Sequence, residues 1–182
     1  AEALDYVGPA RPRLVAVAGL SGSGKSTLAR ALAADLAPAP GAMVLRSDEI
    51  RKLVAGVGDT VRLGAEHYTR DASDRVYRLL LAAAAAALAA GRSVVTDAVS
   101  LHPEERDRFA AIARASEADF TGLWLDVAPE VAAARVAART GDASDADARV
   151  VAFQAGLDPG AIDWPRIDAS GLLTPAEGMR AD

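Results

Sequence analysis

The chain has 182 residues, a formal net charge of −5 and no cysteine, and 51% of its residues are hydrophobic. This length favours one domain with a sizeable core, and the lack of cysteine excludes disulfides and thiolate metal sites. The acidic balance argues against a broad nucleic-acid surface. No stretch resembles a signal peptide or is long and apolar enough to span a bilayer. We therefore expect a cytoplasmic protein without a membrane partner.

The first residues predict a linker that leads into a buried strand. Residues 1–12 contain two prolines and a glycine, which is typical of a connecting segment. Because the chain starts at Ala1 and not at a methionine, we expect an excised or processed domain. The apolar run over residues 13–18 predicts a strand that is buried on both faces. We expect the folded domain to cover residues 13–174 and a carboxyl-terminal tail to cover residues 175–182.

The segment from Gly19 to Thr27 matches the phosphate-binding P-loop, G-x-x-x-x-G-K-[ST], at every specified position. Its glycines allow backbone conformations in which successive N–H groups turn toward one anion. Lys25 supplies an ammonium group for the β- and γ-phosphates, and Ser26 supplies a hydroxyl for Mg²⁺. The alternative, a flexible Gly/Ser connector, does not explain the strand before the segment and the helix predicted at residues 27–36. The predicted ATP-binding residues are Gly19, Ser21, Gly22, Ser23, Gly24, Lys25, Ser26 and Thr27.

Strands and helices alternate along the rest of the chain. Apolar runs predict strands at residues 42–46, 93–97 and 120–127, and a short last strand within residues 164–168. Helices are expected at residues 49–53, at 65–90 with Gly91 closing the helix, from Pro103, from Pro129 to Thr140, and after a Ser144 cap. This alternation implies right-handed crossovers and an α/β fold whose parallel sheet is covered by helices on both faces.

Two acidic residues, Asp48 and Asp97, follow predicted strands, so we expect them at the edge of the sheet where ligands bind. Asp48 and Arg51 lie three residues apart at a helix start and share a face. The carboxylate can take a proton from an attacking hydroxyl while the guanidinium holds the substrate or the transferred phosphate. The alternative is a helix cap that pairs with a surface arginine. Asp97 is placed like a Walker-B acid that holds Mg²⁺; a loop cap or a substrate contact are its alternatives.

Arg135 and Arg139 lie four residues apart and therefore share one helix face. Gly141 follows them, so we predict a hinged helical lid whose arginines cover the triphosphate. A cation in that position stabilises the charge that develops during phosphoryl transfer. The alternative is a solvated arginine face that pairs with Glu130 or Asp142.

Two weaker candidates for acceptor binding are Tyr68 and Arg70. They follow the glycine-containing segment at residues 56–60, which has no helical period. Tyr68 fits equally well as a partly buried amphipathic residue whose hydroxyl is hydrogen-bonded.

Four segments together resemble the P-loop kinase group, which includes gluconate kinase, polynucleotide 5′-hydroxyl kinases, chloramphenicol phosphotransferase and zeta toxins. These segments are G-L-S-G-S-G-K-S-T (19–27), S-D-E-I-R (47–51), V-V-T-D-A (94–98) and R-V-A-A-R (135–139). The nearest likeness is to predicted ATP-dependent kinases that occur alone or behind an aminoglycoside-phosphotransferase-like domain. The run D-A-S-D-A (142–146) also resembles that subgroup. The likeness covers about residues 13–168.

The resemblance implies a three-layer P-loop fold with a five-stranded parallel sheet and a helical lid. It also implies that Asp48 is a general base, that Arg51 contacts the substrate, and that Arg135, with Arg139 as a second candidate, contacts the γ-phosphate. A fused N-terminal phosphotransferase-like domain is the implied protein partner. Nucleoside monophosphate kinases usually carry a D-G-x-P-R-like segment after the third strand, whereas this chain has D-A-V-S-L at residues 97–101. That departure disfavours a nucleotide acceptor.

We therefore predict an ATP- and Mg²⁺-dependent phosphotransferase that acts on a hydroxyl of a small molecule. One alternative is a nucleoside monophosphate or polynucleotide 5′-hydroxyl kinase, although nucleic acid is not the expected partner. Another is a regulatory ATPase module, which would have no need of the acceptor base offered by Asp48. The predicted catalytic residues are Lys25, Asp48, Arg135 and Arg139, the substrate-binding residues are Asp48, Arg51, Tyr68 and Arg70, and the metal ligands are Ser26 and Asp97.

Overall fold

The structure is a computed structural model that describes residues 11–36 and 40–171. Most of the linker predicted at residues 1–12 and all of the tail predicted at 175–182 lie outside these ranges. The elements are β1 (Arg13–Gly19), α1 (Lys25–Asp35), β2 (Met43–Arg46), α2 (Ser47–Ala55), η2 (Ala65–Tyr68), α3 (Arg70–Ala89), β3 (Val94–Asp97), α4 (Pro103–Ala115), β4 (Asp119–Asp126), α5 (Pro129–Ala138), α6 (Ala148–Ala155) and β5 (Arg166–Asp168).

The five strands form one sheet in the order β2-β3-β1-β4-β5, and all pairs of neighbours are parallel. This confirms the predicted α/β class and the five-stranded parallel sheet that the resemblance implied. The pairing register sets Asp97 opposite Val17 of β1 on one side and opposite Arg46 of β2 on the other. The carboxyl ends of the three strands therefore bring Arg46 and Asp97 together directly beneath the P-loop.

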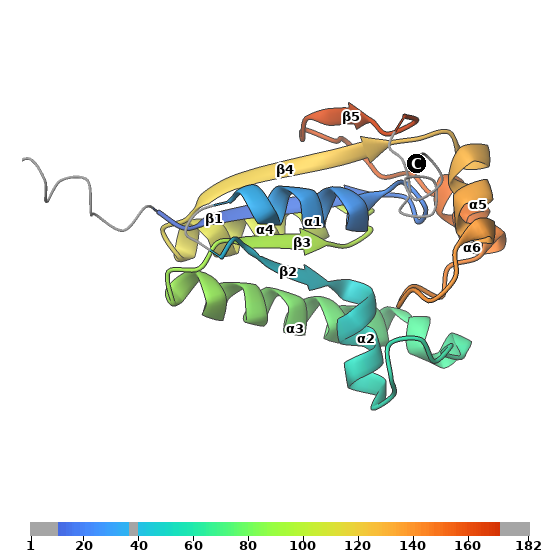
Figure 1. The fold of residues 1–182 in the computed structure, drawn as a ribbon, viewed down its shortest axis with the longest axis horizontal. Coiled ribbons are helices and arrows are strands. Elements are labelled where there is room, and N and C mark those ends of the chain that lie inside the picture. The colour runs from blue at the N-terminus through green and yellow to red at the C-terminus, as the bar shows by residue number, and fades with distance from the viewer. Residues whose placement is uncertain (1–10, 37–39, 172–182) are drawn as a thin grey trace, which may run out of the picture.

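Helices cover both faces of the sheet (Figure 1), and alternate residues of β1 pack against opposite helix layers. Leu14 and Ala16 pack with α3 and α4, and Val15 and Val17 pack with α1. β1 is thus buried on both faces, which is why it has no polar alternation. None of the described helices has the length and apolarity that a membrane crossing requires.

Helices α5 and α6 stand beyond the carboxyl ends of β1 and β4 (Figure 1). They pack on each other through Ala132 and Val136 of α5 and Val151 of α6, all of which are buried. The predicted lid is therefore a helix pair with an apolar contact of its own, and the segment at residues 139–147 connects the two helices.

The prediction of a single helix at residues 65–90 is wrong, because the structure divides this segment into η2 and α3. A 3₁₀ turn, η2, ends at Tyr68, and Thr69 has extended backbone angles (φ −62°, ψ 162°). The Thr69 hydroxyl accepts a hydrogen bond of 3.3 Å from the Ala72 N–H and so caps the start of α3. Gly91 closes the helix region as predicted, with φ of 77°.

The predicted helix cap at Ser144 is also wrong. Asp147 caps α6, and its Oδ1 accepts hydrogen bonds from the backbone N–H groups of Arg149 (2.9 Å) and Val150 (3.1 Å). A carboxylate there also interacts favourably with the helix dipole. Helix α5 ends at Ala138, two residues earlier than expected. Ser144 therefore lies within the connecting segment, which covers the carboxyl edge of the sheet.

The close packing of β4 predicts a stability effect at Gly122. A Cβ at this position would overlap the Trp164 ring, which also stacks edge-on against Phe120 at 5.8 Å. We expect Gly122→Ala to destabilise the protein by about 1–3 kcal/mol through overpacking and to lower the melting temperature by about 2–4 °C per kcal/mol. Gly58→Ala is the matched control, since a Cβ there has no atom within 4 Å. Equal melting temperatures for the two variants would contradict the expectation.

Candidate active site

The P-loop joins β1 to α1 in a conformation that requires its glycines. Gly19, Gly22 and Gly24 have φ values of 135°, 81° and 96°, which would strain a residue with a side chain. A Cβ on Gly22 would also lie 2.8 Å from Val136 Cγ2 and would overlap the carbonyl oxygen of Ala132. Helix α5 therefore rests directly on the phosphate-binding loop.

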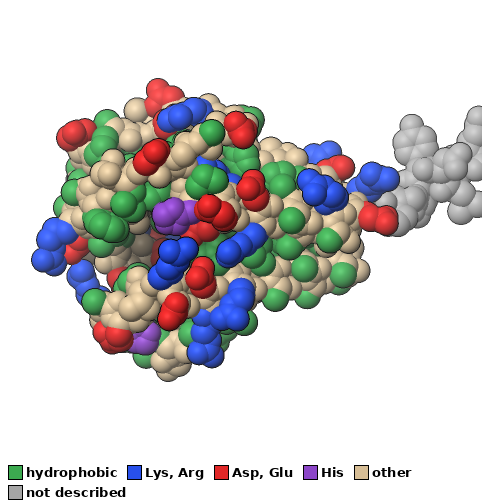
Figure 2. Space-filling model, turned by 180° about the vertical axis from the view of Figure 1, so that it is seen from behind, with side chains coloured by type: hydrophobic (Ala, Val, Ile, Leu, Met, Phe, Trp, Pro, Cys, Tyr) green, Lys and Arg blue, Asp and Glu red, His purple; other side chains and the backbone are tan. Residues whose placement is uncertain are grey.

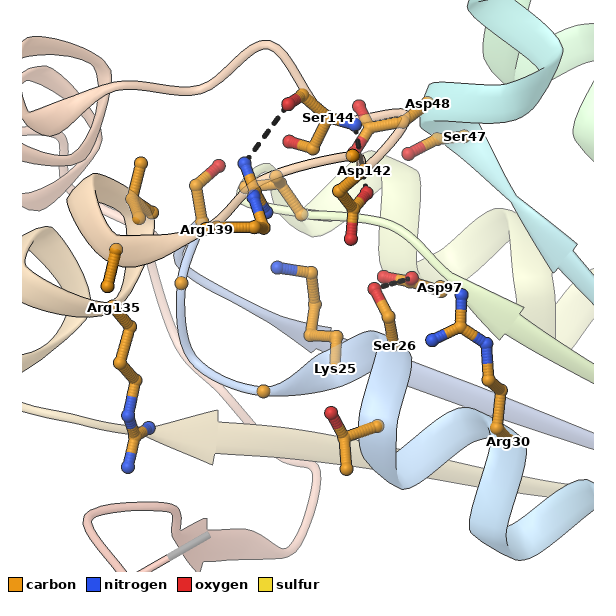
Figure 3. Close-up of a pocket in the computed structure, with 18 of the residues that line it drawn as sticks. Lys25, Ser26, Arg30, Ser47, Asp48, Asp97, Arg135, Arg139, Asp142 and Ser144 are labelled. Carbon is orange, nitrogen blue, oxygen red and sulfur yellow. Dashed lines mark hydrogen bonds between the residues drawn. The ribbon is translucent and has the colours of Figure 1, made fainter. Parts of the chain in front are cut away.

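Lys25 is buried at the start of α1, and its Nζ donates a hydrogen bond of 2.8 Å to the Leu20 carbonyl within the loop. Burial lowers the pKa of Lys25, and the negative charges of Asp97 and Asp48 act in the opposite direction. The ammonium group thus projects into a space that it shares with two carboxylates (Figure 3).

The two predicted metal ligands are in direct contact. Ser26 Oγ donates a hydrogen bond of 2.6 Å to Asp97 Oδ2. A hydroxyl and a carboxylate are oxygen ligands of the kind that Mg²⁺ prefers, and Mg²⁺ beside a nucleotide is usually held by few protein groups. The donor set at Ser26 and Asp97 therefore fits a magnesium ion that phosphate oxygens would also bind.

Arg46 contacts both of these residues and was not predicted as part of the site. Its guanidinium is 5% exposed. Nε donates to Asp97 Oδ2 at 3.0 Å, and Nη2 donates to Ser26 Oγ at 3.1 Å and to Asp142 Oδ1 at 2.8 Å. Nη1 pairs with Glu49 at 3.0 Å. Burial by itself lowers the pKa of Arg46, but the contacts with Asp142 and Asp97 raise it above its usual range. Nearly all basic residues of this chain are arginines, so an arginine at the end of a strand did not stand out in the sequence as a site residue.

Asp48 lies in the first turn of α2 and lines the same cavity as Lys25. Burial raises the pKa of Asp48, and the neighbouring charge of Asp97 raises it further. The charges of Lys25 and Arg46 and a contact with Ser144 oppose this shift. A carboxylate with a raised pKa is a stronger base than an ordinary aspartate, as proton abstraction from a hydroxyl requires.

A cavity of about 330 Å³ unites most of the predicted site. Lys25 projects into it from the P-loop side, while Asp48, Asp142 and Ser144 lie across from the lysine (Figure 3). Gly19 and Ser23 belong to the loop but do not line the cavity, and the Ser23 hydroxyl is buried without a hydrogen-bond partner among the described residues. The predicted residues that line the cavity are Ser21, Gly22, Gly24, Lys25, Ser26, Thr27, Asp48, Asp97, Arg135 and Arg139.

The two predicted lid arginines point in different directions. Arg139 follows α5 and donates to the Ser144 carbonyl at 3.1 Å, on the side of the cavity that faces Lys25 (Figure 3). Arg135 points away from Lys25 and donates to the carbonyls of Ala169 (3.0 Å) and Ser170 (2.8 Å), just after β5. In this conformation only Arg139 is directed toward the lysine, and the γ-phosphate contact of Arg135 stays a prediction.

The structure does not bring the remaining predicted acceptor residues to the cavity. Arg51 is 9% exposed and lies under Tyr68, with its guanidinium carbon 4.7 Å from the ring centre. It donates to the His67 carbonyl and, at 3.5 Å, to the Ser73 hydroxyl. Arg70 begins α3 and is exposed. Arg51 therefore joins α2 to η2 and α3, and its predicted substrate contact would require this packing to open.

A second buried ion pair joins α2 to the connecting segment at residues 139–147, which we call the lid segment. The Lys52 side chain is 1% exposed, and its Nζ lies 2.6 Å from both carboxylate oxygens of Asp145. Asp145 also accepts hydrogen bonds from the Leu63 N–H (3.1 Å) and from the Tyr68 hydroxyl. One carboxylate thus anchors the segment after α5 to α2, to the loop before η2 and to η2 itself.

Helix α6 makes a further contact that the sequence did not indicate. Gln154 Oε1 accepts a hydrogen bond of 2.9 Å from the backbone N–H of Ser21 in the P-loop. Together with the packing of α5 on Gly22, this bond connects both lid helices to the loop.

The Lys52–Asp145 pair predicts a large stability effect when one partner is removed. Asp145→Ala leaves a buried ammonium group without its counterion, so we expect it to destabilise the protein by about 3–5 kcal/mol in chemical unfolding. The double variant Lys52→Met/Asp145→Leu should recover most of this loss, because no charge stays buried. A double variant as unstable as Asp145→Ala would show that the carboxylate's contacts with Leu63 and Tyr68 dominate instead.

Residues 14–157 match a family described as AAA domain. An uncharacterised protein of Mycobacterium tuberculosis and one of Mycobacterium bovis are each 32% identical to the chain over 176 residues. The alignment covers 93% of this chain and 34% of each relative. The chain therefore spans about a third of the length of the curated relatives it matches.

Solved kinase structures share the fold. A gluconokinase from Sinorhizobium meliloti is 26% identical with a TM-score of 0.55, covering 93% of this chain and 89% of the gluconokinase. An APS kinase from Mycobacterium tuberculosis, in complex with AMPPNP and APS, is also 26% identical, with a TM-score of 0.52 and coverage of 65% and 66%. A putative kinase from Chloroflexus aurantiacus has a TM-score of 0.65 at 20% identity, over 90% and 88% of the chains. Because the family match spans residues 14–157, the chain belongs to the AAA domain family, and its similarity to the gluconokinase and the APS kinase identifies it as a P-loop kinase domain.

Proposed function

We propose that this domain transfers the γ-phosphoryl group of ATP to a hydroxyl of a small molecule in a Mg²⁺-dependent reaction. One observation carries the proposal: the Asp48 carboxylate, with its raised pKa, lines the same cavity as Lys25 and the Ser26–Asp97 pair. A triphosphate-binding loop alone would serve a switch or a hydrolase equally well. A base across the cavity from the lysine is what phosphoryl transfer to a second molecule needs.

Each residue of the cavity then has a distinct task. The P-loop N–H groups bind phosphate oxygens. When the triphosphate binds, Lys25 Nζ donates to phosphate oxygens in place of the Leu20 carbonyl. Arg139 is close enough to Lys25 to lower its pKa, so its charge acts on the same volume. Bound Mg²⁺ supplies neutralisation of the phosphate charge. Asp48 holds the acceptor hydroxyl and takes its proton.

The shape and charge of the site favour a small acceptor. The cavity of about 330 Å³ must hold both the end of the triphosphate and the acceptor. Two ion pairs, Arg46–Asp142 and Lys52–Asp145, hold the lid segment across one side of it. Acidic and basic side chains are intermingled over the face shown in Figure 2, in contrast to the single basic surface expected for nucleic-acid binding. The similarity to a gluconokinase over most of both chains supports the same acceptor class.

The greater length of the curated relatives supports a further part of the proposal. We propose that this kinase domain acts next to another domain of the same protein, of the phosphotransferase-like kind that the resemblance implied. The acceptor would then be chosen by the kinase cavity, while the neighbouring domain would supply a second activity or a binding site.

The assignment of Asp48 is tested by Asp48→Asn. We expect transfer of labelled γ-phosphate to fall by about 10²–10⁴-fold, the usual contribution of a general base, while ATP binding is retained. The acceptor panel should contain sugars, polyols and aminoglycosides, with nucleoside monophosphates and 5′-hydroxyl oligonucleotides as competing classes. Lys25→Ala serves as the blank, and Asp107→Asn, an exposed helical acid, serves as the control. Undiminished transfer by the Asp48→Asn protein would refute the role of Asp48.

The raised pKa of Asp48 predicts how stability and rate depend on pH. Because the folded state raises this pKa, the protonated form is favoured on folding, and the stability that it contributes is lost as the pH rises through the folded-state value. Asp48→Asn should therefore raise the melting temperature at neutral pH, by about 2–4 °C for each kcal/mol that the buried charge costs. This difference should shrink on acidification below the unfolded pKa, near 4.

Transfer requires the deprotonated carboxylate, so the acid limb of the rate profile should lie above the ordinary aspartate pKa of about 4. The pH dependence of kcat and thermal melts from neutral to acid pH measure the two effects. A melting temperature that falls in the Asp48→Asn protein, together with an acid limb at or below pH 4, would contradict the raised pKa.

A further inference from the structure

We infer that Arg46 is a positioning residue: it orients Asp97 and Ser26 toward a divalent cation and links this pair to the lid segment through Asp142. The inference rests on the proposed Mg²⁺–nucleotide site. It gives a function to Arg46, to which the proposed reaction assigns none. Arg46 does not line the cavity. Its effect must therefore pass through the residues that it holds.

The hydrogen bonds of Arg46 leave one acceptor position open on each metal ligand. Asp97 Oδ2 receives both the Ser26 hydroxyl (2.6 Å) and Arg46 Nε (3.0 Å), so Oδ1 is the carboxylate oxygen left for a ligand among the described contacts. Ser26 Oγ donates its proton to Asp97 and accepts from Arg46 Nη2 (3.1 Å), which leaves one of its two lone pairs. Arg46 thus fixes the rotation of both groups.

The charge of Arg46 is balanced in a way that permits a cation nearby. A lone guanidinium beside the Ser26–Asp97 pair would repel Mg²⁺. Here Asp97, Glu49 and Asp142 lie within 3.0 Å of its three nitrogens, so three carboxylates surround one buried positive charge. The cluster keeps a net negative charge, which attracts a divalent cation.

Asp142 makes this arrangement sensitive to the lid. It follows Gly141 in the segment after α5, and its Oδ1 also accepts a hydrogen bond of 3.0 Å from the Ser144 N–H. Arg139, which faces Lys25, donates to the carbonyl of the same Ser144. The segment that carries the arginine directed at the phosphate site is therefore bonded to the arginine that orients the metal ligands.

Orienting the metal ligands requires the several N–H donors of a planar guanidinium, and a single ammonium charge is not enough. Only a planar group with several fixed donors can reach Asp97, Ser26, Asp142 and Glu49 at once. Arg46→Lys keeps the positive charge but can serve one or two of these partners, so it separates orientation from charge.

The test measures how much Mg²⁺ strengthens nucleotide binding. The affinity of each protein for a non-hydrolysable ATP analogue is determined by calorimetry with Mg²⁺ and again with EDTA, and the ratio of the two affinities is compared. We expect Arg46→Lys to lower this ratio by about tenfold, as the loss of charged hydrogen bonds to one ligand group would, while the affinity in EDTA changes by less than about twofold. The matched control is Arg106→Lys, because Arg106 is also buried (4% exposed) but donates to four backbone carbonyls away from the cavity.

Asp142→Asn provides a second, milder variant, since Asp142 is partly exposed and its loss leaves the contact of Arg46 with Asp97 intact. With one balancing carboxylate neutralised, we expect the ratio to fall by about two- to fivefold. An unchanged ratio in both variants would overturn the inference, and so would a loss of nucleotide affinity that is equally large with Mg²⁺ and with EDTA. Either result would leave the proposed function standing. A wild-type protein whose nucleotide affinity does not respond to Mg²⁺ would overturn both.

Discussion

The hydrogen-bonded cluster of Arg46, Asp97 and Ser26 is the constraint on which the rest of the site depends. It joins the ends of β2 and β3 to the first turn of α1, at the point where the parallel register brings the strands together. A buried guanidinium with a single partner would be costly. With three carboxylates around it the charge is compensated, and the same compensation sets up an acidic environment next to the phosphate-binding loop.

Burial is the main cause of both pKa shifts in the cavity, and the acidic environment adds to the shift of Asp48 and opposes that of Lys25. Asp48 is raised in pKa by burial and by Asp97, and Lys25 is lowered by burial while the same carboxylates oppose the shift. A carboxylate and an ammonium group with shifted pKa values, held in one cavity, are typical of a functional site. The glycines of the loop and the packing of α5 on Gly22 keep this arrangement rigid on the phosphate side.

The lid is connected to the site more extensively than a hinge at Gly141 suggests. Asp142 pairs with Arg46, Asp145 pairs with Lys52, and Gln154 bonds to the backbone of Ser21. The first contact leads to the Ser26–Asp97 pair, the second to α2 and the third to the P-loop. Helix α5 and the connecting segment at residues 139–147 both line the cavity, and α6 supports them from outside it. Movement of the lid would therefore have to break contacts with β2, α2 and the P-loop.

The sequence by itself determined the fold class, the P-loop and the position of Asp48 and Asp97 at one edge of the sheet. These features depend on local patterns: strand periodicity, the eight consecutive positions of the P-loop motif, and the rule that parallel strands end together. Only the tertiary structure decided the contacts of Arg46, Lys52 and Gln154, each of which has at least one partner 51 to 133 residues away. It also showed that Arg51 packs under Tyr68 and that Thr69 divides a predicted helix. Contacts across such separations depend on how the layers pack, and no local pattern encodes which buried charge meets which carboxylate.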